Sequence, residues 1–142
     1  MKTKKTLRRA GVLFSFLALA AMLALPAVAK TPNAKPRRPT VAIIRADWCS
    51  ACRKLEPTMM ELMGQYKGRI DFVLLDVTDD QKAAQAATAA RKLGLARFFE
   101  ANKKKTSTVV VLSPSHKILY QTAMNFDRDA YVKAFDEAIA KG

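Results

Sequence analysis

The sequence contains few of the residues that build metal centres and cross-linked scaffolds, with 2 cysteines, 1 histidine and 1 tryptophan among 142 residues. Two cysteines exclude a disulfide-rich scaffold and a four-cysteine zinc site, and a single histidine leaves few ways to complete a zinc site. The sequence also lacks a phosphate-binding glycine loop, a serine nucleophile elbow and a pair of catalytic carboxylates. With only 5 glycines, 6 prolines and a hydrophobic content of 50%, the chain is expected to form one folded domain rather than a disordered region.

No acidic residue precedes Asp47, and the first part of the chain has the organisation of a secretory signal peptide. Basic residues come first, an apolar run over 12–25 follows, and small residues end at Ala29. The apolar run is short for a membrane-spanning helix, which needs about 20 residues. We therefore expect residues 1–29 to be a signal peptide cleaved after Ala29, and the protein to be secreted or periplasmic. The alternative is an uncleaved anchor, in which case the protein would be membrane-bound.

Residues 30–39 (KTPNAKPRRP) combine three prolines with four basic residues and predict a flexible leader, followed by a folded domain over 40–142. The formal net charge of the whole chain is +13, but nine of its basic residues lie before Thr40. The domain is therefore only mildly basic. Since an exported protein rarely meets nucleic acid, we expect a solvated basic surface and no nucleic-acid partner.

Hydrophobic periodicity predicts the order β-α-β-α-β-β-α. Strands are expected over 41–44, 70–77, 108–112 and 117–124, and helices over 51–66, over 81–93 and after Asp127. The stretch 95–105 is ambiguous between helix and loop. The first β-α-β unit makes its strands parallel and the late hairpin adds antiparallel pairing. We expect an α/β domain, a mixed sheet with helices on both faces.

One motif carries chemistry: Cys49 and Cys52 form a C-x-x-C pair where the first predicted strand gives way to the first predicted helix. At a helix start, unpaired N–H groups and the helix dipole favour a thiolate on Cys49, and a thiolate is the species that attacks disulfides. The alternatives are a structural disulfide or two buried thiols. A bridge across so short a loop constrains the unfolded chain little, which favours a redox function.

The W-C-x-x-C motif, with a proline five residues after Cys52, resembles the thioredoxin superfamily over residues 40–142. The resemblance implies a compact thioredoxin-like fold with four strands, the first lying between the second and the third. It also implies a thiol–disulfide oxidoreductase that acts on protein thiols and disulfides without a bound cofactor or metal. Cys49 would attack and Cys52 would resolve the mixed disulfide. The supporting residues would be Trp48 beside the pair, Ser50 and Ala51 within it, and the helix-kinking Pro57.

Two departures from the family pattern bear on the site. The family usually carries a cis-proline before the third core strand, where this sequence has Thr106 and Ser107. A cis bond before a non-proline residue costs about 3 kcal/mol, so we expect a trans peptide at Ser107 or a rearranged loop in the substrate groove. The buried acid and lysine that move the resolving thiol's proton in cytosolic thioredoxins are replaced by Ile43 and Leu74.

Other functions remain open on the sequence alone. Met59, Met60 and Met63 follow the cysteines, and soft sulfur ligands suggest a copper(I)-binding or copper-delivery module, although core packing explains these methionines more simply. A redox-inert binding module is a further alternative. We expect a monomer, with a membrane electron donor or acceptor as a further partner, and the sequence leaves open whether the role is reducing, oxidising or isomerising.

Overall fold

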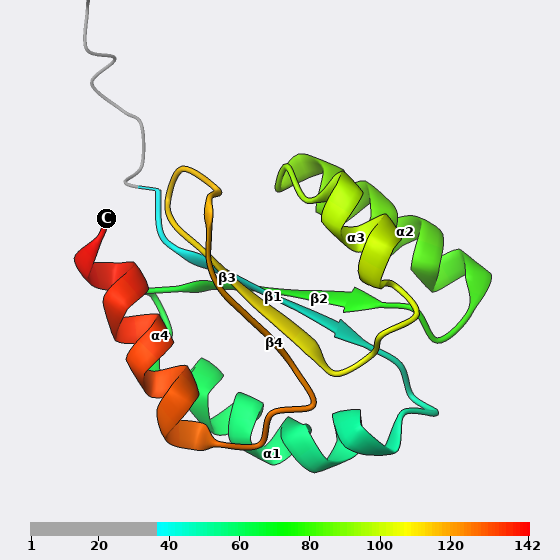
Figure 1. The fold of residues 1–142 in the computed structure, drawn as a ribbon, viewed down its shortest axis with the longest axis horizontal. Helices are drawn as coiled ribbons and strands as arrows, with labels where there is room; N and C mark the ends of the chain where they lie inside the picture. The colour runs from blue at the N-terminus through cyan, green and yellow to red at the C-terminus, as the bar shows by residue number, and fades with distance from the viewer. Residues whose placement is uncertain (1–36) are drawn as a thin grey trace, which may run out of the picture. The chain divides into compact units, whose positions relative to one another are not determined.

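A computed structural model describes residues 37–142, so the predicted signal peptide and most of the predicted leader lie outside the described residues. The elements follow in the order β1 (Thr40–Arg45), α1 (Ser50–Gln65), β2 (Asp71–Asp76), α2 (Asp80–Lys92), α3 (Ala96–Asn102), β3 (Thr108–Leu112), β4 (Ile118–Ala123) and α4 (Arg128–Ala140) (Figure 1). The predicted strands and helices are confirmed to within two residues at the ends that the sequence defined. No helix of this described part is long and apolar enough to cross a membrane.

The sheet has the strand order β2-β1-β3-β4, which confirms a four-stranded mixed sheet with the first strand between the second and the third. The first strand, β1, pairs in parallel with β2 and antiparallel with β3, and the hairpin strand β4 pairs antiparallel with β3. This arrangement follows from the helical crossover between β1 and β2 and from the tight turn between β3 and β4.

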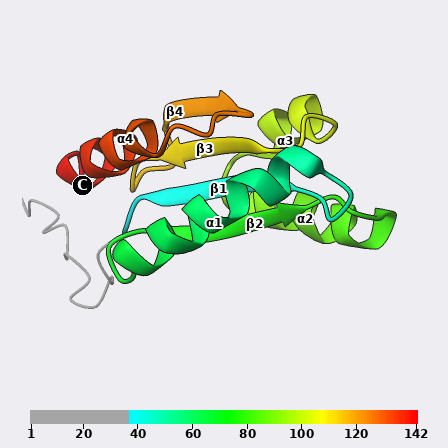
Figure 2. The same ribbon diagram turned by 90° about the horizontal axis from the view of Figure 1, so that it is seen from below.

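Helices cover both faces of the sheet, with α1 and α4 on one face and α2 and α3 on the other (Figures 1 and 2). Alternate residues of the central strands supply the two cores, because successive side chains of a strand point to opposite faces. Val41 and Val109 pack towards α1 and α4, whereas Ile44 and Val110 pack towards α2 and α3. Both central strands are therefore apolar over 41–44 and 109–112, as expected for strands buried on two faces.

The ambiguous stretch after α2 contains a helix, α3, that the periodicity did not define. Gly94, with φ of +72°, ends α2 and turns the chain, and no side chain caps the start of α3. What holds this short helix is packing, since Leu95 and Phe99 are buried against α2 and the sheet. A seven-residue segment without a cap gives a weak local signal, and tertiary contacts decide its conformation.

The last residues of the predicted leader are attached to the domain. Pro39 is buried, and its carbonyl accepts a hydrogen bond from the Asp71 N–H at 2.9 Å. Arg38 forms an ion pair with Asp71 and donates to the Gly68 carbonyl at 3.0 Å. These contacts extend the folded part of the chain two residues before Thr40, where the domain was expected to begin.

Candidate active site

Cys49 is the N-cap of α1, at the point where the loop from β1 enters the helix. Its backbone is extended, with φ of −83° and ψ of 110°, and its Sγ accepts a hydrogen bond from the Cys52 N–H at 3.0 Å. Serine, threonine and aspartate usually fill this position because a side-chain acceptor satisfies an unpaired N–H group of the first turn. Here a sulfur does so, which places it in the positive field of the helix start.

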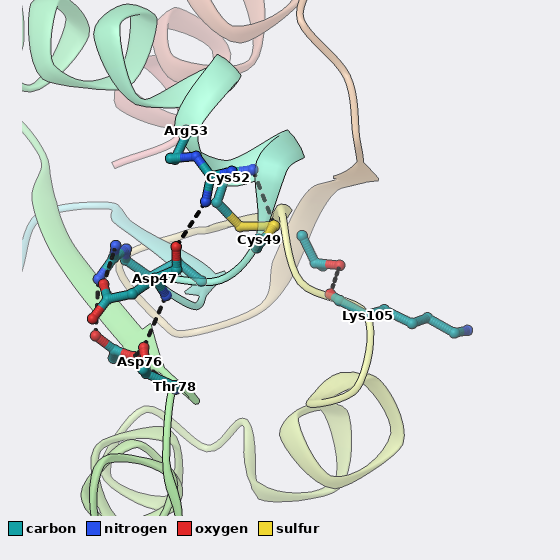
Figure 3. The surroundings of a disulfide bond; sticks show 9 residues. Asp47, Cys49, Cys52, Arg53, Asp76, Thr78 and Lys105 are labelled. Atoms are coloured by element: carbon teal, nitrogen blue, oxygen red, sulfur yellow. Dashed lines mark hydrogen bonds and ion pairs between the residues drawn. A yellow bond between two sulfur atoms is a disulfide. The ribbon is translucent and has the colours of Figure 1, made fainter.

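Cys49 and Cys52 are joined by a disulfide, with a Cα–Cα distance of 5.2 Å that is normal for such a bond (Figure 3). Both residues are nearly buried, at 6% and 7% exposure, and pack with Ala46. The predicted pair is thus brought together at the expected place. Since bonding distance and helix position are both met, the site can cycle between a disulfide and a dithiol.

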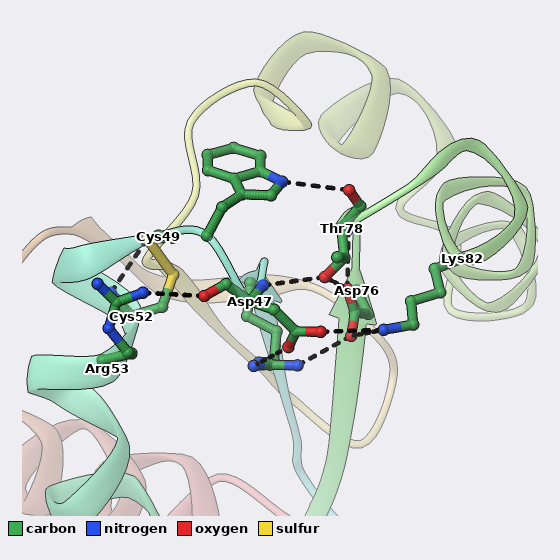
Figure 4. Close-up of polar contacts among 9 residues, drawn as sticks. Asp47, Cys49, Cys52, Arg53, Asp76, Thr78 and Lys82 are labelled. Carbon is green, nitrogen blue, oxygen red and sulfur yellow. Dashed lines mark hydrogen bonds and ion pairs between the residues drawn. A yellow bond between two sulfur atoms is a disulfide. The ribbon is translucent and has the colours of Figure 1, made fainter.

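The segment before Cys49 is held by Asp47. Its N–H donates to the Thr78 hydroxyl at 2.9 Å, and its carbonyl accepts from the Arg53 guanidinium at 2.9 Å (Figures 3 and 4). Its carboxylate forms ion pairs with Arg45 at 2.7 Å and Lys82 at 3.1 Å. Hydrogen bonds from Arg45 and Lys82 lower the pKa of Asp47, which stays ionised but charge-paired, so it opposes a Cys49 thiolate less than its charge alone would suggest.

Asp76, at the end of β2, is the second carboxylate of this network. It accepts hydrogen bonds from the Thr78 N–H and hydroxyl, and its other oxygen lies 2.8 Å from Arg45 and 3.7 Å from Lys82 (Figure 4). Burial acts to raise the pKa of Asp76, but the Thr78 hydrogen bonds and the two positive charges outweigh burial, so the pKa is lowered. The parallel pairing of β1 and β2 places Arg45 opposite Asp76 and makes this network possible.

Trp48 is 61% exposed and directly precedes Cys49 in the sequence. Its Nε1–H donates at 3.2 Å to the carbonyl of Thr78, in the loop between β2 and α2, which fixes the position of the indole. An exposed aromatic ring held by one hydrogen bond offers apolar contact area at a small entropic cost. Trp48, expected beside the pair, thus presents an exposed ring next to Cys49 in the sequence.

The remaining predicted residues surround the pair in different ways. Ser50 is exposed and Ala51 half-buried in the first turn of α1, and Pro57 is exposed within the same helix. Thr106 is half-buried in the loop before β3, which also carries the exposed Lys105, whose side chain points away from the disulfide (Figure 3). All of them thus lie on α1 or on the loop facing it.

Ser107 adopts a left-handed backbone, with φ of +61°, and is only 1% exposed. Its N–H donates to the Ile44 carbonyl at 2.8 Å, and its carbonyl accepts from the Met124 N–H at 2.9 Å. A proline ring fixes φ near −65° and removes the N–H, so this backbone is not one that a proline could adopt. The loop therefore differs from a proline-containing one in conformation as well as in sequence.

A cavity of about 190 Å³ opens beside Cys52. Its walls are mainly apolar, and its lining includes Ile43, Leu74, Met59, Glu56, Arg45 and Ser107. Ile43 and Leu74, which replace the acid and the lysine of cytosolic thioredoxins, thus line the cavity beside Cys52 as apolar residues.

Three residues of the network were not predicted from the sequence, namely Asp76, Thr78 and Lys82. Their signal was the polar sequence that follows an apolar strand, at the edge where β1 also ends. Among the described residues there is no group of three or more histidine, cysteine or acidic side chains that could hold a metal ion. Met59 is buried on the core side of α1, which supports the packing interpretation of this methionine, whereas Met60 of the same helix is exposed.

Comparison with known proteins agrees with this geometry. The thioredoxin family model matches residues 31–119. The chain is 48% identical over 40 residues to the chloroplastic thioredoxin-like protein HCF164 of Oryza sativa subsp. japonica, covering 28% of this chain and 15% of that protein. It is 43% identical over 54 residues to the HCF164 protein of Arabidopsis thaliana, covering 38% and 20%. The matches therefore span less than a quarter of the length of these two relatives.

Solved structures support the fold independently of sequence identity. A thiol:disulfide interchange protein of the thioredoxin family from Chlorobium tepidum TLS superposes with a TM-score of 0.52 at 15% identity, covering 73% of this chain and 81% of that one. At such low identity the likeness concerns the fold alone. Because the family model matches more than half of the sequence and the fold agrees, the chain belongs to the thioredoxin family.

Proposed function

We propose that this protein is an exported thiol–disulfide oxidoreductase that exchanges disulfides with protein partners through Cys49 and Cys52. The observation that carries the proposal is the Cys49 sulfur at the N-cap of α1, bonded to Cys52 and accepting its N–H. In the reduced protein the same N–H and the helix dipole stabilise a Cys49 thiolate. The reaction needs no bound cofactor.

In the direction that reduces a partner, the Cys49 thiolate attacks one sulfur of the partner's disulfide. The partner's other sulfur leaves as a thiolate and takes a proton from solvent, while a mixed disulfide joins Cys49 to the partner. Cys52, deprotonated, then attacks the Cys49 sulfur, forms the Cys49–Cys52 disulfide and releases the partner's second thiolate. Two electrons pass to the partner, and since each step is reversible, the same groups can oxidise one.

The supporting residues have different roles, which depend on their positions around the Cys49–Cys52 pair. Trp48 supplies an apolar contact for the partner chain, and Ser50 and Ala51 set the turn that brings the two sulfurs together. Pro57 shapes α1 behind them. Thr106 and Ser107, in the loop facing the disulfide, line the groove for the partner's backbone.

The N-terminal residues support export. Residues 1–29 would act as the signal peptide, 30–39 as the leader and 40–142 as the thioredoxin-like domain, released as a periplasmic or secreted monomer. A membrane electron donor or acceptor would then renew the redox state of the pair. Mass spectrometry of the exported protein tests this, since cleavage after Ala29 leaves Lys30 as the first residue.

Variants of the two cysteines test the exchange reaction. Cys49→Ser should abolish reduction of a protein disulfide, whereas Cys52→Ser should still attack and should accumulate the mixed disulfide, seen by mass spectrometry. Ser115→Ala, an exposed residue of the turn between β3 and β4, should keep a rate near that of the wild type. Unchanged exchange by Cys49→Ser would contradict the proposal, and stoichiometric copper(I) binding without exchange would favour the metal-binding alternative.

The reduction potential then assigns the direction of electron flow. Equilibration with thiol buffers and counting of thiols should give a value near about −270 mV for a reductase that needs an electron supply. A value near about −120 mV would instead indicate a disulfide donor.

A further inference from the structure

The hydroxyl of Ser107 stands out in the part of the chain that the structure describes. It is the one buried side-chain polar atom of residues 37–142 without a hydrogen-bond partner among the protein groups. Buried hydroxyls are nearly always paired, because burial removes their hydrogen bonds to water and an unpaired group keeps that cost. For an unpaired hydroxyl at a functional site, we therefore look for another state of the site in which the hydroxyl has a hydrogen-bond partner.

Ser107 is held at the redox pair by its backbone. Its N–H and carbonyl are both used, by Ile44 and Met124, which fixes the residue between the ends of β1 and β4. Ser107 and Cys52 line the same cavity. The neighbouring Lys105 is anchored as well, since its carbonyl accepts from the Thr108 hydroxyl at 2.6 Å (Figure 3). None of these hydrogen bonds involves the cysteines, so opening the disulfide breaks none of the contacts that hold the serine at this cavity.

The structure contains the disulfide form, in which each sulfur is bonded to its partner and is a weak acceptor. Reduction by a dithiol breaks the S–S bond and adds two electrons and two protons, leaving two thiols while the dithiol becomes a disulfide. A thiol donates and accepts, and a thiolate accepts strongly. At Cys52, a strong hydrogen-bond partner is therefore present only in the reduced form.

We infer that the Ser107 hydroxyl hydrogen-bonds the Cys52 sulfur once the disulfide opens, and so stabilises the reduced form over the oxidised form. Ser107 is then a redox-tuning residue: it raises the reduction potential of the pair. The inference rests on the proposed function only in requiring that the Cys49–Cys52 pair can be reduced and reoxidised.

A second explanation of the serine is purely conformational, because non-glycine residues adopt a positive φ at a cost. The two explanations separate in a pair of variants. Ser107→Gly removes the hydroxyl and suits the positive φ, whereas Ser107→Ala removes the hydroxyl and keeps the backbone penalty. Both variants should behave alike if the hydroxyl is what matters for the potential.

The experiment equilibrates the purified protein with glutathione and its disulfide. The equilibrium constant for oxidation of the Cys49–Cys52 pair should rise about tenfold in Ser107→Gly and in Ser107→Ala, a fall of about 30 mV in potential for two electrons. Ser113→Ala is the matched control. Ser113 is buried at the other end of β3, and its hydroxyl is already paired with Ser115 and with the Lys117 N–H, so its removal should leave the constant unchanged.

Unfolding by urea in each redox state gives a second readout. The Ser107 variants should lose more stability in the reduced form than in the oxidised form, where the hydroxyl has no partner to lose. An unchanged equilibrium constant in both variants, a shift in Ser107→Ala alone, or equal losses in the two redox states would overturn the inference. Because the equilibrium is measured with glutathione, it tests this inference even if the protein fails to exchange disulfides with protein partners.

Discussion

Ile43 lies directly opposite Leu74 in the parallel pairing of β1 and β2, and both line the cavity beside Cys52. Ile43 is 5% exposed and Leu74 is 52% exposed. In the thioredoxins that this chain resembles, an acid and a lysine at these positions move the proton of the resolving thiol. Here neither side chain can carry a proton, so the resolving step that we propose for Cys52 must use another route.

Introducing the acid tests what this apolar pairing contributes. Ile43→Asp should lower the free energy of unfolding by about 3 kcal/mol at pH 7, because it removes a buried apolar group and buries a carboxyl. Burial raises the pKa of such a carboxyl above about 3.9, its unfolded value, so the penalty should grow as pH rises through and above that value. Urea unfolding at several pH values measures this.

The register partner provides the control for that variant. Leu74→Lys changes an exposed side chain, so the free energy of unfolding should stay within about 0.5 kcal/mol of the wild type. A loss as large as that of Ile43→Asp would show that the two positions are not distinguished by burial.

The Asp76 network should make stability depend on acid pH. The pKa of Asp76 is lowered in the folded state, so its contribution is present above its unfolded pKa near about 3.9 and is lost as pH falls through the lower folded value. Asp76→Asn should therefore lower stability by about 1–2 kcal/mol at pH 7 and weaken the acid dependence. Thermal unfolding between pH 7 and pH 2 checks both effects. An unaltered pH profile in the variant would assign the acid dependence to other carboxylates.

Lys105 should influence which partners react fastest. It is exposed on the loop beside the disulfide (Figure 3), so Lys105→Glu should slow exchange with an acidic peptide disulfide severalfold and speed exchange with a basic one. Stopped-flow rates at low and high salt measure this, and the difference should shrink as salt rises. Lys117→Glu makes the same charge change in the turn at the far end of β3. Equal effects from both variants would point to net charge rather than to the position of Lys105.

Phe99 should hold α3 and the loop that follows it. Because its ring is 1% exposed in the core on the α2 and α3 face, Phe99→Ala should cost about 3–5 kcal/mol and loosen residues 96–105. Hydrogen exchange of these amides, together with urea unfolding, provides the measurement. Phe98→Ala, at a half-buried neighbour, should cost clearly less, and a similar cost for both would indicate that Phe99 is not the anchor.

Most of the secondary structure, and the position of Cys49, could be predicted from local sequence patterns. The apolar runs of β1 and β3 and the capping residue Asp127 before α4 predicted elements that the structure confirms, because buried strands and helix starts have short local signatures. The C-x-x-C spacing likewise placed Cys49 at a helix start. These features depend on residues only a few positions apart.

Features that join distant segments were decided by the tertiary structure. The ion pairs of Arg45 with Asp76 and of Asp47 with Lys82 exist because parallel pairing brings the ends of β1 and β2 together. The helix α3 forms because Phe99 packs into the core between α2 and the sheet. The sequence determined which residue replaces the family's proline. The tertiary structure determined its conformation, because the Ser107 N–H donates to the Ile44 carbonyl and the Ser107 carbonyl accepts from the Met124 N–H, which holds a left-handed backbone and leaves the hydroxyl buried without a partner.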